Sequence, residues 1–283
     1  MSVNAQEGID FNSMVRMDGR GIVVLGSGGV GIGEAVTKML AAGGADILCV
    51  NFDQPEAERM AQEVGGEAYV ADITDRDQVK KLFEYADKKF GDRFYGFVDI
   101  IGGTLHGPLE DFDDHAIEEM LTMNLRHAVY AAQYAGPLLR KHGKGAMVFI
   151  SSLAGDIVSP GHALYGVGKA GLNHFMHYCA DEFGPDGVRA NCIGTGLIQY
   201  PSMETTVHSE AMKKVTEGTA LRRTGKPIEI AGAVYFLMSD LASYVTGSVL
   251  HVEGGRMIGM SGIPRSGMGR DVHTNEASEM NAG

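Results

Sequence analysis

The chain has 283 residues, of which 44% are hydrophobic and 21% charged, a composition typical of globular proteins with a substantial core. Its net charge of −12 argues against nucleic acid and anionic membranes as partners, because both would repel it. The sequence contains neither an apolar run long enough to span a bilayer nor a signal peptide pattern, so we expect a cytoplasmic protein.

Residues 1–18 show no clear periodicity and are predicted to form an extension on the surface. The apolar run 22–25 then leads into the glycine-rich stretch 26–33 and a helical pattern. Strand, glycine turn and helix in this order open a dinucleotide-binding unit, because glycines let the backbone approach a pyrophosphate at a helix N-terminus. This pattern predicts cofactor contacts from Gly26, Ser27, Val30, Gly31, Ile32 and Gly33.

The second apolar run, residues 47–50, is followed by Asn51 and Asp53. An acidic residue about 20 positions beyond the glycine motif suits the ribose hydroxyls of NAD, whereas a nearby arginine suits the 2′-phosphate of NADP. Residues 45–58 contain no lysine or arginine, so the sequence favours NAD, with Asn51 and Asp53 near the ribose. Asp53 could also cap the following helix, which does not exclude contact with the ribose.

The third strand is predicted at residues 68–71 and is followed by Asp72 and Thr74, either of which could cap the next helix. The fourth strand is predicted at residues 97–101. It contains Asp99, whose carboxylate needs partners if it is buried. Residues 114–141 read mostly as helix, with no stronger interruption than Gly136 and Pro137.

The fifth strand, residues 146–150, is an apolar run typical of a buried parallel strand. Ser152 follows it at the strand's carboxyl end, where open α/β sheets bind ligands. Tyr165 and Lys169 are four residues apart and would share one face of a helix. A neighbouring ammonium favours the phenolate and lowers a tyrosine pKa, which makes the phenol a general acid and base. The alternative is an ordinary helix tyrosine with a solvated lysine.

Beyond the helix, residues 188–193 form another apolar strand, and Gly196 and Ile198 lie in the loop after it. Residues 199–222, which include Tyr200 and Met203, are typical of a lid over a substrate. We expect one dinucleotide-binding and catalytic domain at residues 19–256 and a tail at residues 257–283.

Cysteine and histidine content does not indicate a metal site. Cys49, Cys179 and Cys192 are widely spaced in apolar segments, which suits reduced core thiols. His174 and His177 have helical spacing but no acidic or cysteine partner in step, so no metal ligands are predicted.

Ser152 followed thirteen residues later by Y-x-x-x-K at Tyr165 and Lys169 resembles the signature of the short-chain dehydrogenase/reductase family. The resemblance spans about residues 21–255, with motifs in the family's order. It implies a single α/β domain with a Rossmann-like, doubly wound parallel sheet in three layers. It also implies assembly as a homotetramer or homodimer.

Three motifs depart from the family pattern. Relatives show T-G-x-x-x-G-x-G, of which Gly31 and Gly33 match the last two glycines. Gly26 then falls on the threonine and Ser27 on the first glycine, unless one residue is inserted and Gly26 takes the glycine's part. Residues 99–101 stand where relatives carry N-N-A of N-N-A-G, and a threonine replaces the proline of a P-G motif before Gly196.

The resemblance implies an oxidoreductase that interconverts a secondary alcohol and a ketone. In that scheme Lys169 holds the nicotinamide ribose and tunes Tyr165, which exchanges the proton with the substrate oxygen. Ser152 polarises that oxygen, and Asn124 supports the proton relay.

Further contacts follow from the resemblance. Asp72 and Ile73 would line the adenine pocket, while Gly102, Gly196 and Ile198 would lie along the cofactor toward the nicotinamide. By their positions alone, five residues are candidates for the pocket of the substrate, a mid-sized and partly apolar alcohol or ketone. These are His106, Ser152, His162, Tyr200 and Met203.

Two other functions remain open on the sequence. An NADP-dependent reductase of 3-oxoacyl thioesters requires a basic cradle for the 2′-phosphate, which is not found near Asn51. A non-catalytic nucleotide-binding sensor or scaffold fits the altered glycine and N-N-A-G motifs, but the full set of Asn124, Ser152, Tyr165 and Lys169 argues against it.

Overall fold

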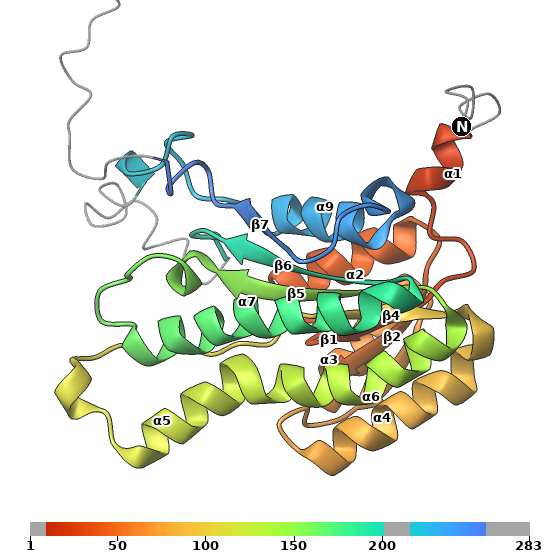
Figure 1. Cartoon of the computed structure of the whole chain (residues 1–283), viewed down its shortest axis with the longest axis horizontal. Helices are drawn as coiled ribbons and strands as arrows, with labels where there is room; N and C mark the ends of the chain where they lie inside the picture. Colours follow the sequence, from red (N-terminus) through yellow and green to blue (C-terminus); the bar gives the residue numbers. More distant parts are fainter. Residues whose placement is uncertain (1–9, 201–215, 259–283) are drawn as a thin grey trace, which may run out of the picture.

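The computed structural model describes residues 10–200 and 216–258 (Figure 1). Seven parallel strands form one sheet in the order β3-β2-β1-β4-β5-β6-β7. The strands are β1 (Gly21–Leu25), β2 (Asp46–Asn51), β3 (Glu67–Val70), β4 (Phe94–Asp99), β5 (Gly145–Ser152), β6 (Val188–Thr195) and β7 (Ser248–Val252). The predicted α/β fold with a doubly wound parallel sheet is confirmed.

Helices cover both faces of the sheet and make three layers (Figure 1). Helices α2 (Ile32–Ala42), α3 (Gln54–Val64) and α9 (Pro227–Met238) pack on one face. On the other face lie α4 (Arg76–Phe90), α6 (His127–His142) and α7 (Ala163–Phe183). Two further helices are α1 (Phe11–Val15) and α5 (Asp114–Leu121). Because both faces are covered, the central strands are continuously apolar rather than alternating.

The point where the strand order reverses positions the functional cavity. The chain runs from β1 outward through β2 and β3, then returns to β4 on the other side of β1. In doubly wound sheets, ligands bind in the crevice at this reversal, outside the carboxyl ends of the strands. β4 ends at Asp99, so Ile100 and Ile101, predicted as strand, belong to the loop that borders this crevice. The carboxylate of Asp99 accepts a hydrogen bond from the Ile101 N–H at 3.1 Å, which turns the chain out of the sheet.

The predicted helix at residues 114–141 is wrong in one respect, because a π-helical turn (Thr122–Arg126) separates α5 from α6. Both the backbone N–H and the ring Nδ1 of His127 point to the Thr122 carbonyl, which closes the wider turn. Pro137 lies inside α6 without ending it. Wide turns of this kind occur often at functional sites, and this one carries Asn124.

The N-terminus of α4 is capped by Asp75, not by Asp72 or Thr74 as the sequence allowed. The Asp75 carboxylate accepts hydrogen bonds from the backbone of Asp77 and Gln78, the donors that a helix start leaves free. Asp72 lies too early in the turn and instead accepts from the backbone and hydroxyl of Thr74.

Cys49, Cys179 and Cys192 are buried and none forms a disulfide, as predicted. Within residues 10–200 and 216–258, none of the helices has the length and apolar character required to cross a bilayer. Part of the predicted N-terminal extension packs on the fold, since the Met17 side chain is fully buried with α2 and α9.

The aromatic core between the sheet and α4 predicts the effect of a truncation. The Phe97 ring lies 5.7 Å from the Phe83 ring and 5.5 Å from the Phe149 ring, both edge to face. We expect Phe97→Ala to lower the free energy of unfolding by about 3–5 kcal/mol in urea denaturation, because it leaves a cavity. Phe11→Ala, at a ring that is 71% exposed, should change it by less than about 0.5 kcal/mol. Equal effects of the two variants would contradict this packing.

Candidate active site

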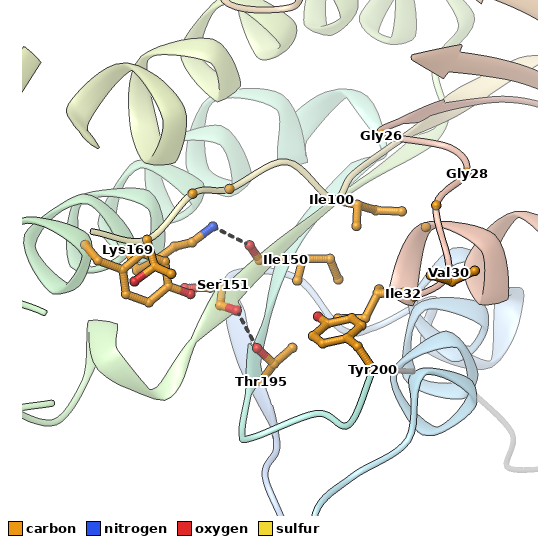
Figure 2. A pocket seen from close by; sticks show the side chains of 17 residues that line it. Gly26, Gly28, Val30, Ile32, Ile100, Ile150, Ser151, Lys169, Thr195 and Tyr200 are labelled. Atoms are coloured by element: carbon orange, nitrogen blue, oxygen red, sulfur yellow. Dashed lines mark hydrogen bonds between the residues drawn. The ribbon is translucent and has the colours of Figure 1, made fainter. Parts of the chain in front are cut away.

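A cavity of about 470 Å³ opens at the carboxyl ends of β1, β4 and β5 (Figure 2). Predicted site residues that line it are Gly26, Val30, Gly31, Ile32, Gly33, Gly102, Tyr165, Lys169 and Tyr200. The lining is completed by Gly103, next to the predicted Gly102, and by seven residues that were not predicted as contacts. These are Gly28, Gly29, Ile100, Thr104, Ile150, Ser151 and Thr195. They follow the same strands and loops as the predicted residues, so the fold brings them in together.

The glycine loop takes its shape from close contact between α2 and β1. A Cβ at Gly33 would lie 2.2 Å from the Gly26 carbonyl oxygen, so only glycine allows this approach. Gly26 has a φ of +84° and faces the cavity. Ser27, predicted to contact the cofactor, is instead fully buried under the loop, where its hydroxyl bonds the Thr37 hydroxyl at 3.1 Å. Gly26 lines the cavity, which favours the alignment with one inserted residue, in which Gly26 takes the part of the first glycine.

Asp53 and Glu56 follow the end of β2 and form an acidic corner beside the glycine loop. The Asn51 amide donates to the Ser27 carbonyl at 2.7 Å, and the Glu56 carboxylate accepts from the Gly29 N–H at 2.9 Å. Hydrogen bonds from Arg59 and then from Gly29 hold the pKa of Glu56 below its ordinary value. Asp53 occupies the N-cap of α3, but its side chain makes no capping bond. Glu56 was missed by the sequence analysis, although it lies in the first turn after Asp53.

Besides Ser27, Asn51 and Asp53, four residues predicted to contact the cofactor do not line the cavity. Ile73 and Ile198 are 6% and 5% exposed and pack into the two cores, because apolar side chains there gain from burial. Gly196 lies so close to the segment after β7 that a side chain would not fit. Asp72 is engaged in its own turn.

Lys169 is buried beside the cavity with 2% of its surface exposed. Its ammonium donates to the Ile150 carbonyl at 2.9 Å and to the Ile101 carbonyl at 3.4 Å (Figure 2). A Cβ at Gly102 would lie 3.0 Å from the Lys169 Nζ and 3.2 Å from the Asn124 Oδ1. Lys169 and Asn124 therefore meet at Gly102.

Asn124 links the π-helical turn to the loop after β4. Its amide nitrogen donates to the carbonyls of Gly103 at 2.8 Å and Met120 at 3.0 Å, and its oxygen accepts from the Gly103 N–H at 3.3 Å. The side chain is fully buried. Asn124 thus connects the π-helical turn to the loop after β4. The sequence around Asn124 did not predict this contact.

The Ser152 hydroxyl interacts with the Tyr165 phenol and acts to lower the pKa of Tyr165. The Lys169 ammonium lies 5.9 Å from the centre of the Tyr165 ring. The Ser152 Oγ also accepts from the Ala154 N–H at 3.2 Å, which fixes its orientation at the end of β5. The structure therefore brings Ser152, Tyr165, Lys169 and Asn124 together.

The charge states differ from the prediction that Lys169 lowers the pKa of Tyr165. Burial raises the pKa of Tyr165, and the hydrogen bond with Ser152 opposes this rise only in part. Burial also lowers the pKa of Lys169 to about 8, while Asp99 acts in the opposite direction. Both shifts follow from loss of water around a charged form. The phenol is therefore protonated near neutral pH, the state of a proton donor.

The predicted substrate residues divide into two groups. The His106 and His162 rings lie 4.9 Å apart, and His162 lies 6.4 Å from the Tyr165 ring. Tyr200 instead packs on the glycine loop, where a Cβ at Gly31 would lie 2.7 Å from its ring. Met203 lies outside the described residues.

A parallel doubly wound sheet with a glycine turn and a cavity at the reversal point defines a Rossmann-type nucleotide-binding protein. The sequence family described as Enoyl-(Acyl carrier protein) reductase matches residues 28–256. A tropinone reductase homolog of Arabidopsis thaliana is 32% identical over 244 residues, which cover 83% of this chain and 92% of that protein. The 3-oxoacyl-[acyl-carrier-protein] reductase FabG of Thermotoga maritima is 30% identical over 249 residues, covering 86% of this chain and 100% of that protein.

Solved structures of dehydrogenases have a similar fold. A short-chain type dehydrogenase/reductase from Mycobacterium ulcerans superposes with a TM-score of 0.81 at 30% identity, covering 86% of this chain and 92% of that one. A 7α-hydroxysteroid dehydrogenase complexed with NADH and 7-oxo glycochenodeoxycholic acid gives a TM-score of 0.80 at 27% identity, covering 89% and 99%. The chain belongs to the short-chain dehydrogenase/reductase family of oxidoreductases, which bind a nicotinamide dinucleotide.

The contact between Gly33 and Gly26 predicts how the loop responds to one added methyl group. We expect Gly33→Ala to weaken NADH binding at least about tenfold in a fluorescence titration, because the helix N-terminus is displaced from the anion. Gly65→Ala is the control, since Gly65 has no atom within 4 Å of an added Cβ, although its φ is positive. It should cost about 1 kcal/mol of stability and leave binding unchanged. Unchanged NADH binding in Gly33→Ala would contradict the loop's role.

Proposed function

We propose that this protein is an NAD-dependent oxidoreductase that interconverts a secondary alcohol and a ketone by hydride transfer. The observation that carries the proposal is the convergence of Ser152, Tyr165 and Lys169 beside a cavity at the reversal point of the sheet. Two relatives support it by name. Besides the tropinone reductase homolog, an NADH-dependent L-xylulose reductase of Ambrosiozyma monospora is 32% identical over 267 residues, covering 87% of this chain and 98% of that protein.

The cavity fits a dinucleotide. The loop around Gly31 and the N-terminus of α2 would hold the pyrophosphate, since a Cβ at Gly33 would fill the space that the loop needs. Tyr165 and Lys169 would hold the nicotinamide ribose, and Asn51 and Asp53 would face the adenosine ribose. When bound, the nicotinamide supplies or accepts the hydride.

The residues of the chain would manage the proton. During reduction, Tyr165 donates its proton to the ketone oxygen, which Ser152 holds by a hydrogen bond. The Lys169 ammonium stabilises the phenolate that results, and Asn124 keeps the loop after β4 in place beside it. Oxidation runs through the same groups in reverse. These steps need a protonated phenol and a charged lysine, so reduction should slow as the pH rises past the Lys169 pKa of about 8.

The acidic corner supports NAD rather than NADP. The Glu56 carboxylate lies against Gly29 and is ionised, so it would repel a 2′-phosphate. Arg59 on α3 is bound by the carboxylates of Glu34, Glu56 and Glu63 and is not free to hold a phosphate. The names of the xylulose reductase and the hydroxysteroid dehydrogenase complex both include NADH.

A second candidate is an NADP-dependent reductase of 3-oxoacyl thioesters. The similarity to the FabG reductase of Thermotoga maritima favours it. Either enzyme would take a small-molecule substrate at His106, Ser152 and His162. We include in the proposal a homotetrameric or homodimeric assembly and a cytoplasmic location.

The experiment is an assay of secondary alcohols, ketones and a 3-oxoacyl thioester with NADH and NADPH. We expect Tyr165→Phe to lower kcat by at least about a hundredfold with a smaller change in KM, because the proton donor is lost. Tyr178→Phe is the matched control on the same helix, since Tyr178 is 63% exposed and should be silent. Full turnover in Tyr165→Phe would exclude the mechanism, and NADH binding without turnover of any substrate would favour a sensor.

Cofactor choice provides a separate test. We expect kcat/KM to be at least about tenfold higher with NADH than with NADPH, because a negative carboxylate faces the added phosphate. Glu56→Gln should narrow that ratio, since it removes the charge and retains an oxygen for the Gly29 N–H. Glu58→Gln, one exposed position nearby on α3, should leave the ratio unchanged. A preference for NADPH in the natural protein would overturn the proposed cofactor.

A further inference from the structure

A buried aspartate and histidine face each other next to Lys169. Asp99 ends β4 and is 1% exposed, and His127 begins α6 and is fully buried. The Asp99 Oδ2 and the His127 Nε2 are 3.0 Å apart, an ion-pair separation without ideal hydrogen-bond alignment. In the part of the chain that the structure describes, neither atom has a hydrogen bond elsewhere. Each is therefore the other's partner.

The short separation and the burial of both groups favour a proton between Asp99 and His127. The His127 Nδ1 lies 3.0 Å from the Thr122 carbonyl, which can only accept, so Nδ1 carries a hydrogen. An unprotonated Nε2 would then point a lone pair at the carboxylate, which is unfavourable in a buried site. A proton between Nε2 and Oδ2 removes that repulsion. That proton offsets only part of the negative charge of Asp99, which lies on the Lys169 side of the pair through Ile101.

His127 connects the pair to Asn124. The same ring that meets Asp99 bonds the Thr122 carbonyl and helps to close the π-helical turn around Asn124. Asn124 in turn bonds both polar backbone groups of Gly103. A change at His127 would therefore relax the turn and move Asn124 relative to Gly102.

Asp99 connects the pair to Lys169 through one residue. The Ile101 N–H donates to Asp99 at 3.1 Å, and the Ile101 carbonyl accepts from Lys169 at 3.4 Å. Two acidic groups raise the pKa of Lys169 against the effect of burial, Asp99 and then Cys192. Burial raises the pKa of the Cys192 thiol, which leaves it neutral. Asp99 is therefore the countercharge of the buried ammonium.

We propose that Asp99 and His127 form a buried positioning pair that keeps Lys169 charged and Asn124 in place for proton transfer. This inference rests on the proposed function, because it assigns a role to a lysine that acts with Tyr165. It concerns positions where the chain departs from the family pattern, which has asparagine in place of Asp99.

The first test is the pH dependence of kcat for ketone reduction in Asp99→Asn. This change keeps the size of the side chain and an oxygen for the Ile101 N–H, and it matches the residue that the family pattern carries. We expect kcat to fall at least about tenfold near pH 7.5, with a smaller change in NADH binding. The falling limb of the profile should move to lower pH, because Lys169 loses its proton more easily without the carboxylate.

The second test has the opposite sign. His127→Gln removes the shared proton and leaves the full charge of Asp99, so the falling limb should move to higher pH. In the double variant Asp99→Asn, His127→Gln the falling limb should lie where it does in Asp99→Asn. Without a carboxylate at position 99, the loss of His127 has no negative charge to release. The proposed pair would be rejected if the falling limb of the pH profile stayed in place in both single variants, or moved in the same direction in both. The His127 variant also decides the matter if Asp99→Asn does not fold.

The matched control lies at the other end of α6. The His142 side chain is 4% exposed and its Nε2 lies 3.5 Å from the partly exposed Asp87 carboxylate, far along the helix from the π-helical turn. His142→Gln should lower stability and leave the pH profile unmoved. Tyr165→Phe separates the two proposals. Full activity in that variant defeats the proposed function, whereas an inactive Tyr165→Phe with unmoved limbs in the Asp99 and His127 variants defeats only the pair.

Discussion

The site depends on the burial of one ammonium group. Taking a charge out of water costs several kcal/mol unless neighbouring groups compensate. Lys169 receives this compensation from two backbone carbonyls and from the negative charge of Asp99. The balance leaves its pKa near 8, so the group is charged but close to losing its proton. A lysine in this state responds strongly to any change in its surroundings.

The groups that compensate the buried charge lie at or just beyond the carboxyl ends of strands. Ile150 is near the end of β5, Ile101 follows β4, and Lys169 lies in the first half of α7. These ends meet because all strands are parallel and their carboxyl ends share one edge of the sheet. The π-helical turn adds Asn124 from a helix that would otherwise carry it elsewhere. The residues around Lys169 therefore all lie at the carboxyl edge of the parallel sheet.

Departures from the family pattern form a connected set in space. The altered glycine motif still presents a glycine to the cavity, because Gly26 lines it while Ser27 is buried in the core. The replacement at Asp99 is accompanied by His127, whose Nε2 lies 3.0 Å from the buried carboxylate. A charge that looked misplaced in an apolar strand therefore has a partner 28 residues later (127 − 99). Motif differences of this type do not by themselves indicate loss of a site.

The sequence alone determined the sheet strands β1 to β6, the glycine turn and the set of Ser152, Tyr165 and Lys169, because apolar runs and helical spacing are local properties. Only the tertiary structure decided which residues face the cavity. It turned Ser27, Ile73 and Ile198 into the core and brought Glu56 to the glycine loop. It also paired Asp99 with His127. Burial and pairing depend on elements distant in sequence, and no local pattern reports which of them will meet.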